Sequence, residues 1–270
     1  MHSSLFRTSL TTCLLLLCIA CCDREQRTGE QRIVSLSPAM TEMLFSMGAG
    51  DRIVGVTTFC DFPPQAKKIT KVGDFSHPSI ERIIALKPDL VIVNLPEQMR
   101  IKKDLDRLKI TTFVSSPHSL SEIYTELSAL GTTLGLYEVA DSLISYMKQN
   151  IEPVHKLRRK KVYVEISPRP IVTIGVATFL NDLIREAGGE NIFADLDKDY
   201  PTVSQEAVIA RDPEIIIVLH PQDITGRIGW QRIRAIKEGR VHAGLNPDNL
   251  MRPGPRLVEG YRALKEIIDD

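Results

Sequence analysis

Two stretches of the chain carry the same pattern half a chain apart: SIERIIALKPDLVIVN at residues 79–94 and SQEAVIARDPEIIIVLH at residues 204–220. When they are aligned, Glu81 falls on Glu206, and a proline follows each glutamate at the same distance. The residue before a proline disfavours helix, and a continuous apolar run is typical of a strand buried on both faces. Each copy is therefore predicted to be a helix followed by a strand. Their agreement at one offset indicates two α/β lobes of similar build.

Strand and helix patterns also alternate outside these stretches, which predicts parallel sheets with helical crossovers. Ser37 followed by Pro38 is typical of a helix N-cap with proline at the first helical position, and Thr178 is a second N-cap candidate. We therefore predict an N-terminal α/β lobe over residues 31–118 and a C-terminal α/β lobe over residues 161–270. The predicted strands outside the repeat lie at residues 32–36, 52–57, 111–115, 161–166 and 240–244.

The alternation stops between the lobes, over residues 119–160. Residues 119–135 have the pattern of one helix, and apolar residues then recur every three or four positions as far as Val154. This stripe predicts a second helix over residues 137–160, about 36 Å long at 1.5 Å per residue, which Pro153 kinks. No Gly/Ser-rich linker interrupts the segment, so the two Rossmann-like lobes are predicted to be joined by a long rigid α-helix.

The first twenty residues differ from the rest. The apolar run at residues 10–20 is too short to span a bilayer but suits the core of a signal peptide. Ala20 before Cys21 resembles a bacterial lipoprotein cleavage site, which predicts a signal peptide over residues 1–20 and a lipid on Cys21. Ordinary signal cleavage nearby is the alternative. Residues 21–30 are mostly polar and unpatterned, and they are predicted to be a tether.

Composition and motifs exclude several classes of function. The chain has 34 Lys+Arg and 34 Asp+Glu, so no basic surplus favours nucleic acid. Cys60 is the one cysteine beyond the tether, which argues against a disulfide scaffold. The histidine spacings indicate no zinc site, and the sequence lacks G-x-S-x-G, P-loop and G-x-G-x-x-G motifs. We predict neither a metal site nor an enzyme, with a periplasmic enzyme or chelatase, or a sensor without a transporter, as alternatives.

Residues 32–93, AGGENIF at residues 187–193 and RPGPRLVEG at residues 252–260 resemble the ABC-transporter substrate-binding proteins for vitamin B12, ferric siderophores and haem, most closely the vitamin B12 branch. The resemblance covers nearly the whole fold. It implies a class III periplasmic binding protein, lipid-anchored in the periplasm or on the cell surface, which delivers its ligand to a permease–ATPase complex. It implies cobalamin or a related corrinoid as ligand, with a ferric siderophore or haem as the alternative, and no resident cofactor.

The resemblance also implies ligand contacts in a cleft between the lobes. Phe59, Phe75 and Tyr200 stand where the B12 proteins have aromatic side chains, on loops at the carboxyl ends of strands, and would flank a flat macrocycle. Asp248 matches a polar ligand contact. Arg252 is expected to face the cleft, where it would bind carboxylates of an anionic chelate.

Other positions have weaker assignments. Arg169 could join Arg252 in the cleft, whereas Arg256 is expected to be structural. Asn94 departs from the aromatic pattern of the B12 proteins, as does the pair Ile171 and Val172. His77 or Cys60 could touch the metal of a bound complex, although a capping or surface role for the histidine and core packing for the cysteine are commoner.

The repeated glutamates have an implied role of their own. In the resembling family one surface glutamate per lobe docks onto arginine pockets of the permease, and these match Glu81 and Glu206 by motif position. A partner built from two like subunits needs two like contacts. The alternative is that each glutamate only favours the N-terminal end of its helix.

Overall fold

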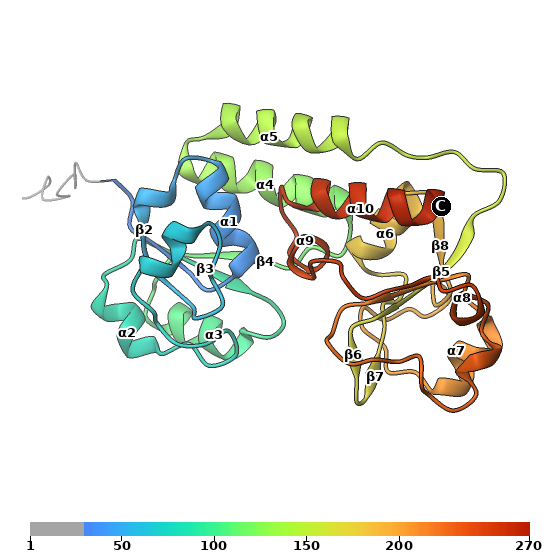
Figure 1. Cartoon of the computed structure of the whole chain (residues 1–270). Helices are drawn as coiled ribbons and strands as arrows, with labels where there is room; N and C mark the ends of the chain where they lie inside the picture. The colour runs from blue at the N-terminus through green and yellow to red at the C-terminus, as the bar shows by residue number, and fades with distance from the viewer. Residues whose placement is uncertain (1–29) are drawn as a thin grey trace, which may run out of the picture. The chain divides into compact units, whose positions relative to one another are not determined.

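The computed structural model describes residues 30–270, of which residues 31–270 form one compact unit. The predicted signal peptide, the lipid on Cys21 and most of the tether lie outside the described residues. Within residues 30–270 no helix is long and apolar enough to cross a membrane. The unit contains two four-stranded parallel sheets, one per predicted lobe (Figure 1).

The sheet of the N-terminal lobe has the strand order β2-β1-β3-β4, with every neighbouring pair parallel. The strands are β1 (Ile33–Ser35), β2 (Ile53–Val56), β3 (Leu90–Asn94) and β4 (Thr112–Ser115), and the helices are α1 (Pro38–Ser46), α2 (Ile80–Ala85) and α3 (Met99–Arg107). As predicted, the Ser37 side chain caps α1 by accepting from the backbone N–H of Met40, and Pro38 opens the helix. Residues 90–93 of β3 are buried, as its continuous apolar pattern requires.

The sheet of the C-terminal lobe has the order β10-β9-β5-β8, again all parallel. Its strands are β5 (Lys160–Glu165), β8 (Gly189–Asn191), β9 (Ile215–Val218) and β10 (Val241–His242), and β6 (Ser167–Pro168) and β7 (Ile171–Val172) form a separate hairpin. Its helices are α6 (Phe179–Glu186), α7 (Gln205–Arg211), α8 (Arg234–Lys237), α9 (Asp248–Met251) and α10 (Leu257–Asp269). The predicted N-cap Thr178 caps α6.

The sequence repeat is the same structural unit in both lobes. Helices α2 and α7 begin after Ser79 and Ser204, whose side chains cap them. The turn that follows has a left-handed backbone at equivalent residues, with φ 46° at Lys87 and 45° at Asp212. Each turn then leads into an inner strand of its sheet, β3 or β9. The predicted repeat of a helix followed by a strand is therefore confirmed, and the two copies also share the left-handed residue in the turn between helix and strand.

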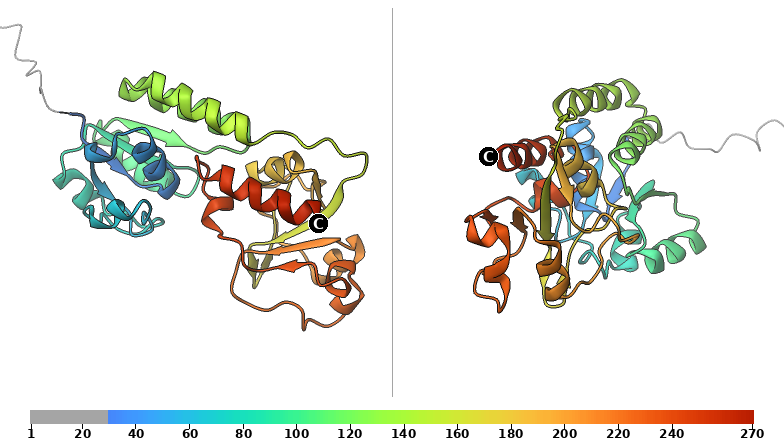
Figure 2. Two further views of the ribbon diagram at one scale, coloured as in Figure 1. Left: turned by 45° about the horizontal axis from the view of Figure 1, so that its top comes forward. Right: turned by 90° about the vertical axis from the view of Figure 1, so that its right-hand side faces the viewer.

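The connection between the lobes consists of two helices, α4 (Leu120–Leu134) and α5 (Tyr137–Asn150), packed against each other. Helix α4 begins beside the C-terminal lobe, where the N–H of Leu120 donates to Asp182 at 3.1 Å. It ends at the N-terminal lobe, where Arg52 donates to the carbonyl of Leu134 at 3.1 Å. Helix α5 returns, so the chain crosses between the lobes along a packed helix pair (Figures 1 and 2).

The second linker helix is shorter than predicted, because it ends at Asn150 instead of residue 160. Pro153 disfavours helix at the residue before it and has no N–H to donate. The chain after α5 is non-helical up to β5 and is held by other partners: Tyr261 donates to the carbonyl of Glu152, and the N–H of Val154 donates to the carbonyl of Glu186. The apolar stripe continues there because Ile151 is buried without being helical.

A single hydrophobic cluster runs through both lobes and the connection. It includes Met40 of α1, Ile123 of α4, Ile184 of α6 and Leu264 of α10, all fully buried. Close-packed protein interiors resist relative displacement of the elements that form them. The lobes are therefore joined through a common core as well as through the chain.

Candidate functional site: the cleft between the lobes

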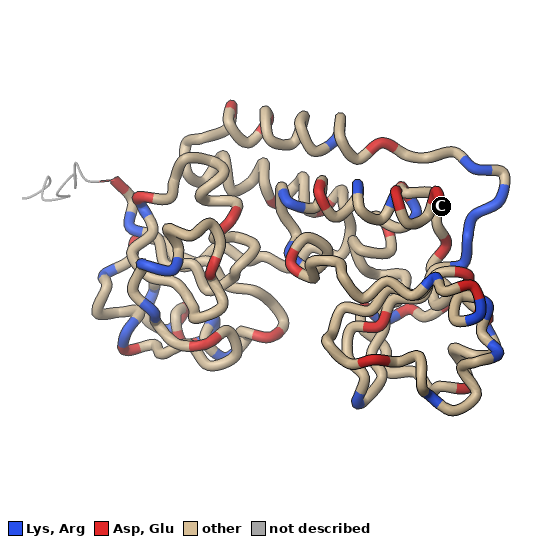
Figure 3. Tube along the Cα trace, viewed as in Figure 1, with Lys and Arg blue, Asp and Glu red and all other residues tan. Residues whose placement is uncertain are grey.

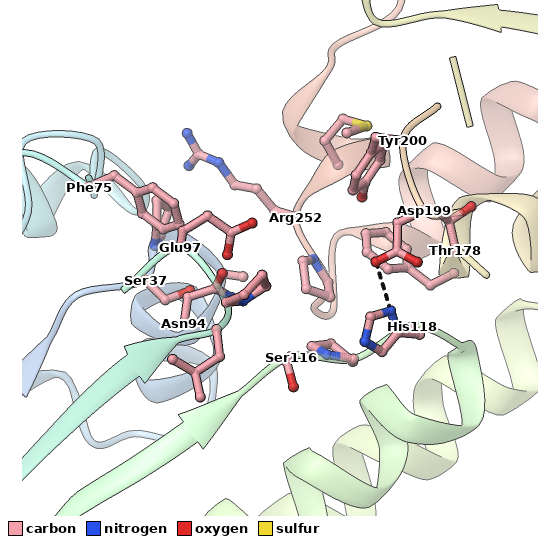
Figure 4. A pocket seen from close by; sticks show the side chains of 18 of the residues that line it. Ser37, Phe75, Asn94, Glu97, Ser116, His118, Thr178, Asp199, Tyr200 and Arg252 are labelled. Atoms are coloured by element: carbon pink, nitrogen blue, oxygen red, sulfur yellow. Dashed lines mark ion pairs between the residues drawn. The ribbon is translucent and has the colours of Figure 1, made fainter. Parts of the chain in front are cut away.

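A cleft of about 570 Å³ lies between the two lobes. On one side it is lined by loops that follow β1, β2, β3 and β4, which contribute Ser37, Phe59, Leu95 and Ser116, among others. The C-terminal lobe lines the other side with residues before and at the start of α6, around Tyr200 and around Arg252 (Figure 4). On the N-terminal side this is the edge where parallel strands end, which is where open α/β sheets bind ligands.

The three predicted aromatic residues all line this cleft. Phe59 is 57% exposed and Tyr200 is 45% exposed, so both rings offer apolar surface to the cleft. Burial of the Tyr200 hydroxyl, followed by the nearby charges of Asp199 and Glu97, raises the pKa of this tyrosine to about 12. Tyr200 therefore offers a neutral hydroxyl and a ring face at neutral pH.

Arg252 also lines the cleft, but its guanidinium is already engaged. It donates through Nη1 to Glu42 and to Asp61, both at 2.8 Å, and its Nε lies 3.0 Å from Asp248. Burial lowers the pKa of Arg252, whereas hydrogen bonds to Glu42 and Asp61 raise it, with a net increase. Arg252 therefore faces the cleft as expected, with three carboxylates already in contact with it.

Asp248 is not among the residues that line the cleft, in contrast to its predicted ligand contact. Its carboxylate lies 3.0 Å from Arg252 Nε and 3.9 Å from Arg256 Nη2. Arg252 is four residues from Asp248, whereas its second carboxylate partner, Glu42, is 210 residues away along the chain. No local pattern signals such a pairing.

Together these side chains form an ion cluster that joins the lobes, which we call the interlobe cluster: Glu42, Asp61, Asp248, Arg252 and Arg256. Glu42 on α1 is 3% exposed and receives both nitrogen ends of Arg256, at 2.7 Å from Nε and 2.5 Å from Nη2. The Arg256 guanidinium also stacks over the Phe62 ring at 4.1 Å. The predicted structural role of Arg256 is confirmed.

A second contact crosses the cleft itself. His118 Nδ1 lies 3.0 Å from Asp199 Oδ2, joining the loop after β4 to the C-terminal lobe (Figure 4). Glu97, after β3, also lines the cleft. The sequence analysis identified neither of these carboxylates nor His118 as a site residue. Their position after predicted strands was the one available signal, and it does not separate them from other polar loop residues.

The remaining candidates lie in or outside the cleft as follows. Asn94 lines it. Cys60 is 1% exposed, within 3.2 Å of the hydroxyls of Thr41 and Thr57, and it does not line the cleft. His77 is exposed and contacts Asp74, also away from the cleft. Within residues 30–270 no group of three or more His, Cys, Asp or Glu could hold a metal ion.

Arg169 and Ile171 line a different cavity, beside the β6–β7 hairpin and the start of α7. Arg169 is therefore not among the residues that line the cleft beside Arg252.

Glu81 and Glu206 occupy the same position in their helices, the second residue after the capping serine. Both are exposed. The Ser79 hydroxyl donates to Glu81 at 2.7 Å and, with the glutamate's own N–H, lowers its pKa. The N–H of Glu206 and the Ser204 side chain lower the pKa of Glu206. Both glutamates therefore present full negative charges, one from α2 and one from α7 (Figure 1).

The charges elsewhere on the described chain are mixed: acidic and basic residues intersperse on both lobes (Figure 3). Residues 156–161 are the most basic short segment, with five Lys or Arg in six positions. Several of these cations have acidic or carbonyl partners, such as Lys156 with Asp269 at 2.7 Å and Arg158 with Glu214 at 2.7 Å. This arrangement gives no support for a nucleic-acid surface.

Comparison with known proteins gives a consistent result. A family model described as periplasmic binding protein matches residues 33–244. The chain is 34% identical over 253 residues to the uncharacterized ABC transporter substrate-binding lipoprotein YvrC of Bacillus subtilis, covering 88% of this chain and 80% of that protein. It is 31% identical over 240 residues to the vitamin B12-binding protein of Vibrio cholerae, covering 85% and 86%. The crystal structure of a possible iron-binding (periplasmic solute-binding) protein from Staphylococcus epidermidis superposes with a TM-score of 0.78 at 30% identity, covering 89% and 99%.

Proposed function

Because this chain belongs to the periplasmic binding protein family, we propose that it is the substrate-binding component of an ABC importer. It captures a metal chelate in the cleft between its lobes and delivers it to a permease–ATPase complex. The substrate-binding name of the Bacillus subtilis relative supports this role. So does the position of the cleft at the carboxyl ends of the N-terminal strands. The cleft is assigned to binding and not to catalysis, and the chelate is cargo and not a resident cofactor.

Cobalamin or a related corrinoid is the ligand that we propose. The observation that carries this proposal is that aromatic rings line both sides of the cleft, Phe59 and Phe75 from one lobe and Tyr200 from the other, with Phe59 and Tyr200 exposed. A flat macrocycle with apolar faces would cover such rings and remove them from water. The vitamin B12-binding relative supports the same ligand. A ferric chelate is the second candidate, favoured by the name of the Staphylococcus epidermidis structure.

Calorimetric titration of the purified protein with cyanocobalamin, a ferric hydroxamate, a ferric catecholate and haem tests the ligand. We expect saturable binding of cyanocobalamin at one molecule per chain. The Phe59→Ala variant should bind it with about 1–3 kcal/mol less free energy, the scale of one lost buried aromatic contact. Val176→Ala, at a residue 43% exposed outside the cleft lining, is the control and should bind as the unchanged chain does. Tight binding of an iron chelate without any corrinoid binding would transfer the assignment to the second candidate.

We further propose that the protein works outside the cytoplasmic membrane and is anchored there by lipid on Cys21. The support is the signal-like apolar run followed by Ala20 and Cys21, together with the lipoprotein name of a relative. A single acyl chain holds a protein only marginally, so more than one is expected.

The change Cys21→Ser tests the anchor. It should release processed protein into the soluble fraction or leave the precursor uncleaved, as read by fractionation and intact mass. Cys22→Ser is the matched control and should remain with the membrane. Normal processing and membrane retention of the Cys21→Ser protein would contradict the lipid assignment.

A further inference from the structure

The charged side chains that line the cleft bear on the net charge of the chelate that it can bind. Among the described residues that line the cleft, the ionisable side chains are Glu97, His118, Asp199, Tyr200 and Arg252. Tyr200 is neutral at physiological pH because burial, Asp199 and Glu97 raise its pKa to about 12. The net charge of the cleft therefore depends on the carboxylates of Glu97 and Asp199, on His118 and on Arg252.

The arginine does not supply a free positive charge. Arg252 contacts three carboxylates, those of Glu42, Asp61 and Asp248. The interlobe cluster as a whole has two guanidinium groups and three carboxylates, so its formal charge is negative. A ligand carboxylate or phenolate arriving at Arg252 would meet a guanidinium whose Nη1 and Nε already contact carboxylates, with these acidic groups beside it.

The two cleft carboxylates come from opposite lobes. Figure 4 shows Glu97 and Asp199 on facing sides of the cleft, with Asp199 bonded to His118. Glu97 is exposed, and the Asp199 side chain is 38% exposed, so both charges reach the space that a ligand would fill. Charges in a concave site with low-dielectric walls act more strongly on a ligand than the same charges on an open surface.

We propose that the cleft selects neutral or cationic chelates and rejects polyanionic ones, with Glu97 and Asp199 setting this selection. The inference rests on the proposed function, since it takes a metal chelate as the occupant. Cyanocobalamin meets the requirement, because its peripheral amides are neutral and its single phosphate is balanced by the cationic metal centre, so that the molecule is neutral overall. Haem with its two propionates and a ferric tricatecholate with three negative charges do not.

The test compares two pairs of probes that differ in charge, of which the first pair also shares a scaffold. The first pair is cyanocobalamin and its monocarboxylate, in which one peripheral amide is hydrolysed. The second pair is the cationic ferric trihydroxamate ferrioxamine B and an anionic ferric tricatecholate. Dissociation constants are measured by calorimetry for the unchanged chain and for the Glu97→Gln/Asp199→Asn variant, at low and at high salt. The control is Glu190→Gln/Asp197→Asn, which removes two exposed carboxylates outside the cleft lining.

We expect the less negative member of a pair to bind the unchanged chain roughly tenfold more tightly per unit of charge, less so at high salt. This preference should shrink toward none in the Glu97→Gln/Asp199→Asn variant and persist in the control. Equal or tighter binding of the anionic member, or a preference unaltered by the cleft substitutions, would overturn the inference and leave the proposed function intact. If no chelate of any charge binds, the proposed function fails and the inference fails with it.

Discussion

A chain carrying both Glu81→Ala and Glu206→Ala is expected to bind cyanocobalamin as the unchanged protein does and to lose most of its permease-dependent transport. The two carboxylates are exposed, ionised and placed at the same position of the repeated helices α2 and α7. Neither is among the residues that line the cleft. Ile83 of α2 and Val208 of α7 are buried in separate clusters of their own lobes, and the common core joins those lobes. One glutamate on each lobe suits simultaneous contact with a two-fold partner.

Two linked contacts strengthen each other, because once one engages the other meets its site at high effective concentration. Each contact alone is an ion pair at the solvent-exposed edge of the interface. Such a pair contributes little to the binding free energy, and salt weakens it further. Each single variant should therefore retain a large share of transport, whereas the double variant should lose at least tenfold. The measurement is uptake of labelled cyanocobalamin by cells that carry each variant, beside calorimetric affinity of the purified proteins.

The matched control is Glu138→Ala combined with Glu190→Ala. Glu138 is also an exposed acid in the first turn of a helix, α5, but it is outside the repeat. This control removes the same charge and should transport normally. If the Glu81→Ala/Glu206→Ala protein transports like the control, or if its ligand affinity falls together with uptake, the repeat is a feature of the fold alone.

Glu42→Ala is expected to lower the free energy of unfolding by about 3–5 kcal/mol, the usual cost of removing one partner of a buried ion pair. Glu42 is 3% exposed, and its loss leaves the buried guanidinium of Arg256 without the carboxylate that receives both of its ends. Arg252 keeps Asp61 and Asp248, so most of the cost arises at Arg256. Such a loss is a large part of the total stability of an ordinary domain.

Urea unfolding followed by circular dichroism measures this effect. Asp106→Ala is the control, since Asp106 pairs with Lys102 at 2.6 Å but its side chain is 52% exposed. That surface pair should contribute no more than about 1 kcal/mol. A Glu42→Ala protein that unfolds at the same urea concentration as the Asp106→Ala protein would show that the interlobe cluster is not stabilising.

The parts of the fold that were predictable from the sequence are those with local signals. A serine or threonine directly before a helix, or a proline soon after one, indicated the ends of α1, α2, α6 and α7. Continuous apolar runs indicated β3 and β9, the strands of the repeat. The second linker helix was over-extended because an apolar period of three to four residues continues past Asn150. Burial of Ile151 produces the same period in a non-helical segment, and periodicity alone cannot separate the two.

The candidate site was predictable where single side chains on loops face the cleft, as Phe59, Phe75 and Tyr200 do. It was not predictable where the partner of a charge decides its role. Arg252 and Asp248 have the composition of a ligand-binding pair, yet they contact each other, and Glu42 and Asp61 from the other lobe also pair with Arg252. His118 and Asp199 meet across 81 positions of the chain, and nothing in either loop indicates the other.

The pairing of Glu42 with Arg256 joins residues 214 positions apart. Contacts of such long sequence separation form late and slow folding, because the intervening chain must be ordered first. A chain that ends before residue 252 would lack both Arg252 and Arg256, so the Glu42 carboxylate on α1 would be buried without a counter-charge, and it would also lack Leu264 from the common core. The N-terminal lobe therefore depends on the segment from Arg252 to the end of α10 for its buried charge partners and for part of its core. Folding is complete only after this segment has been synthesised.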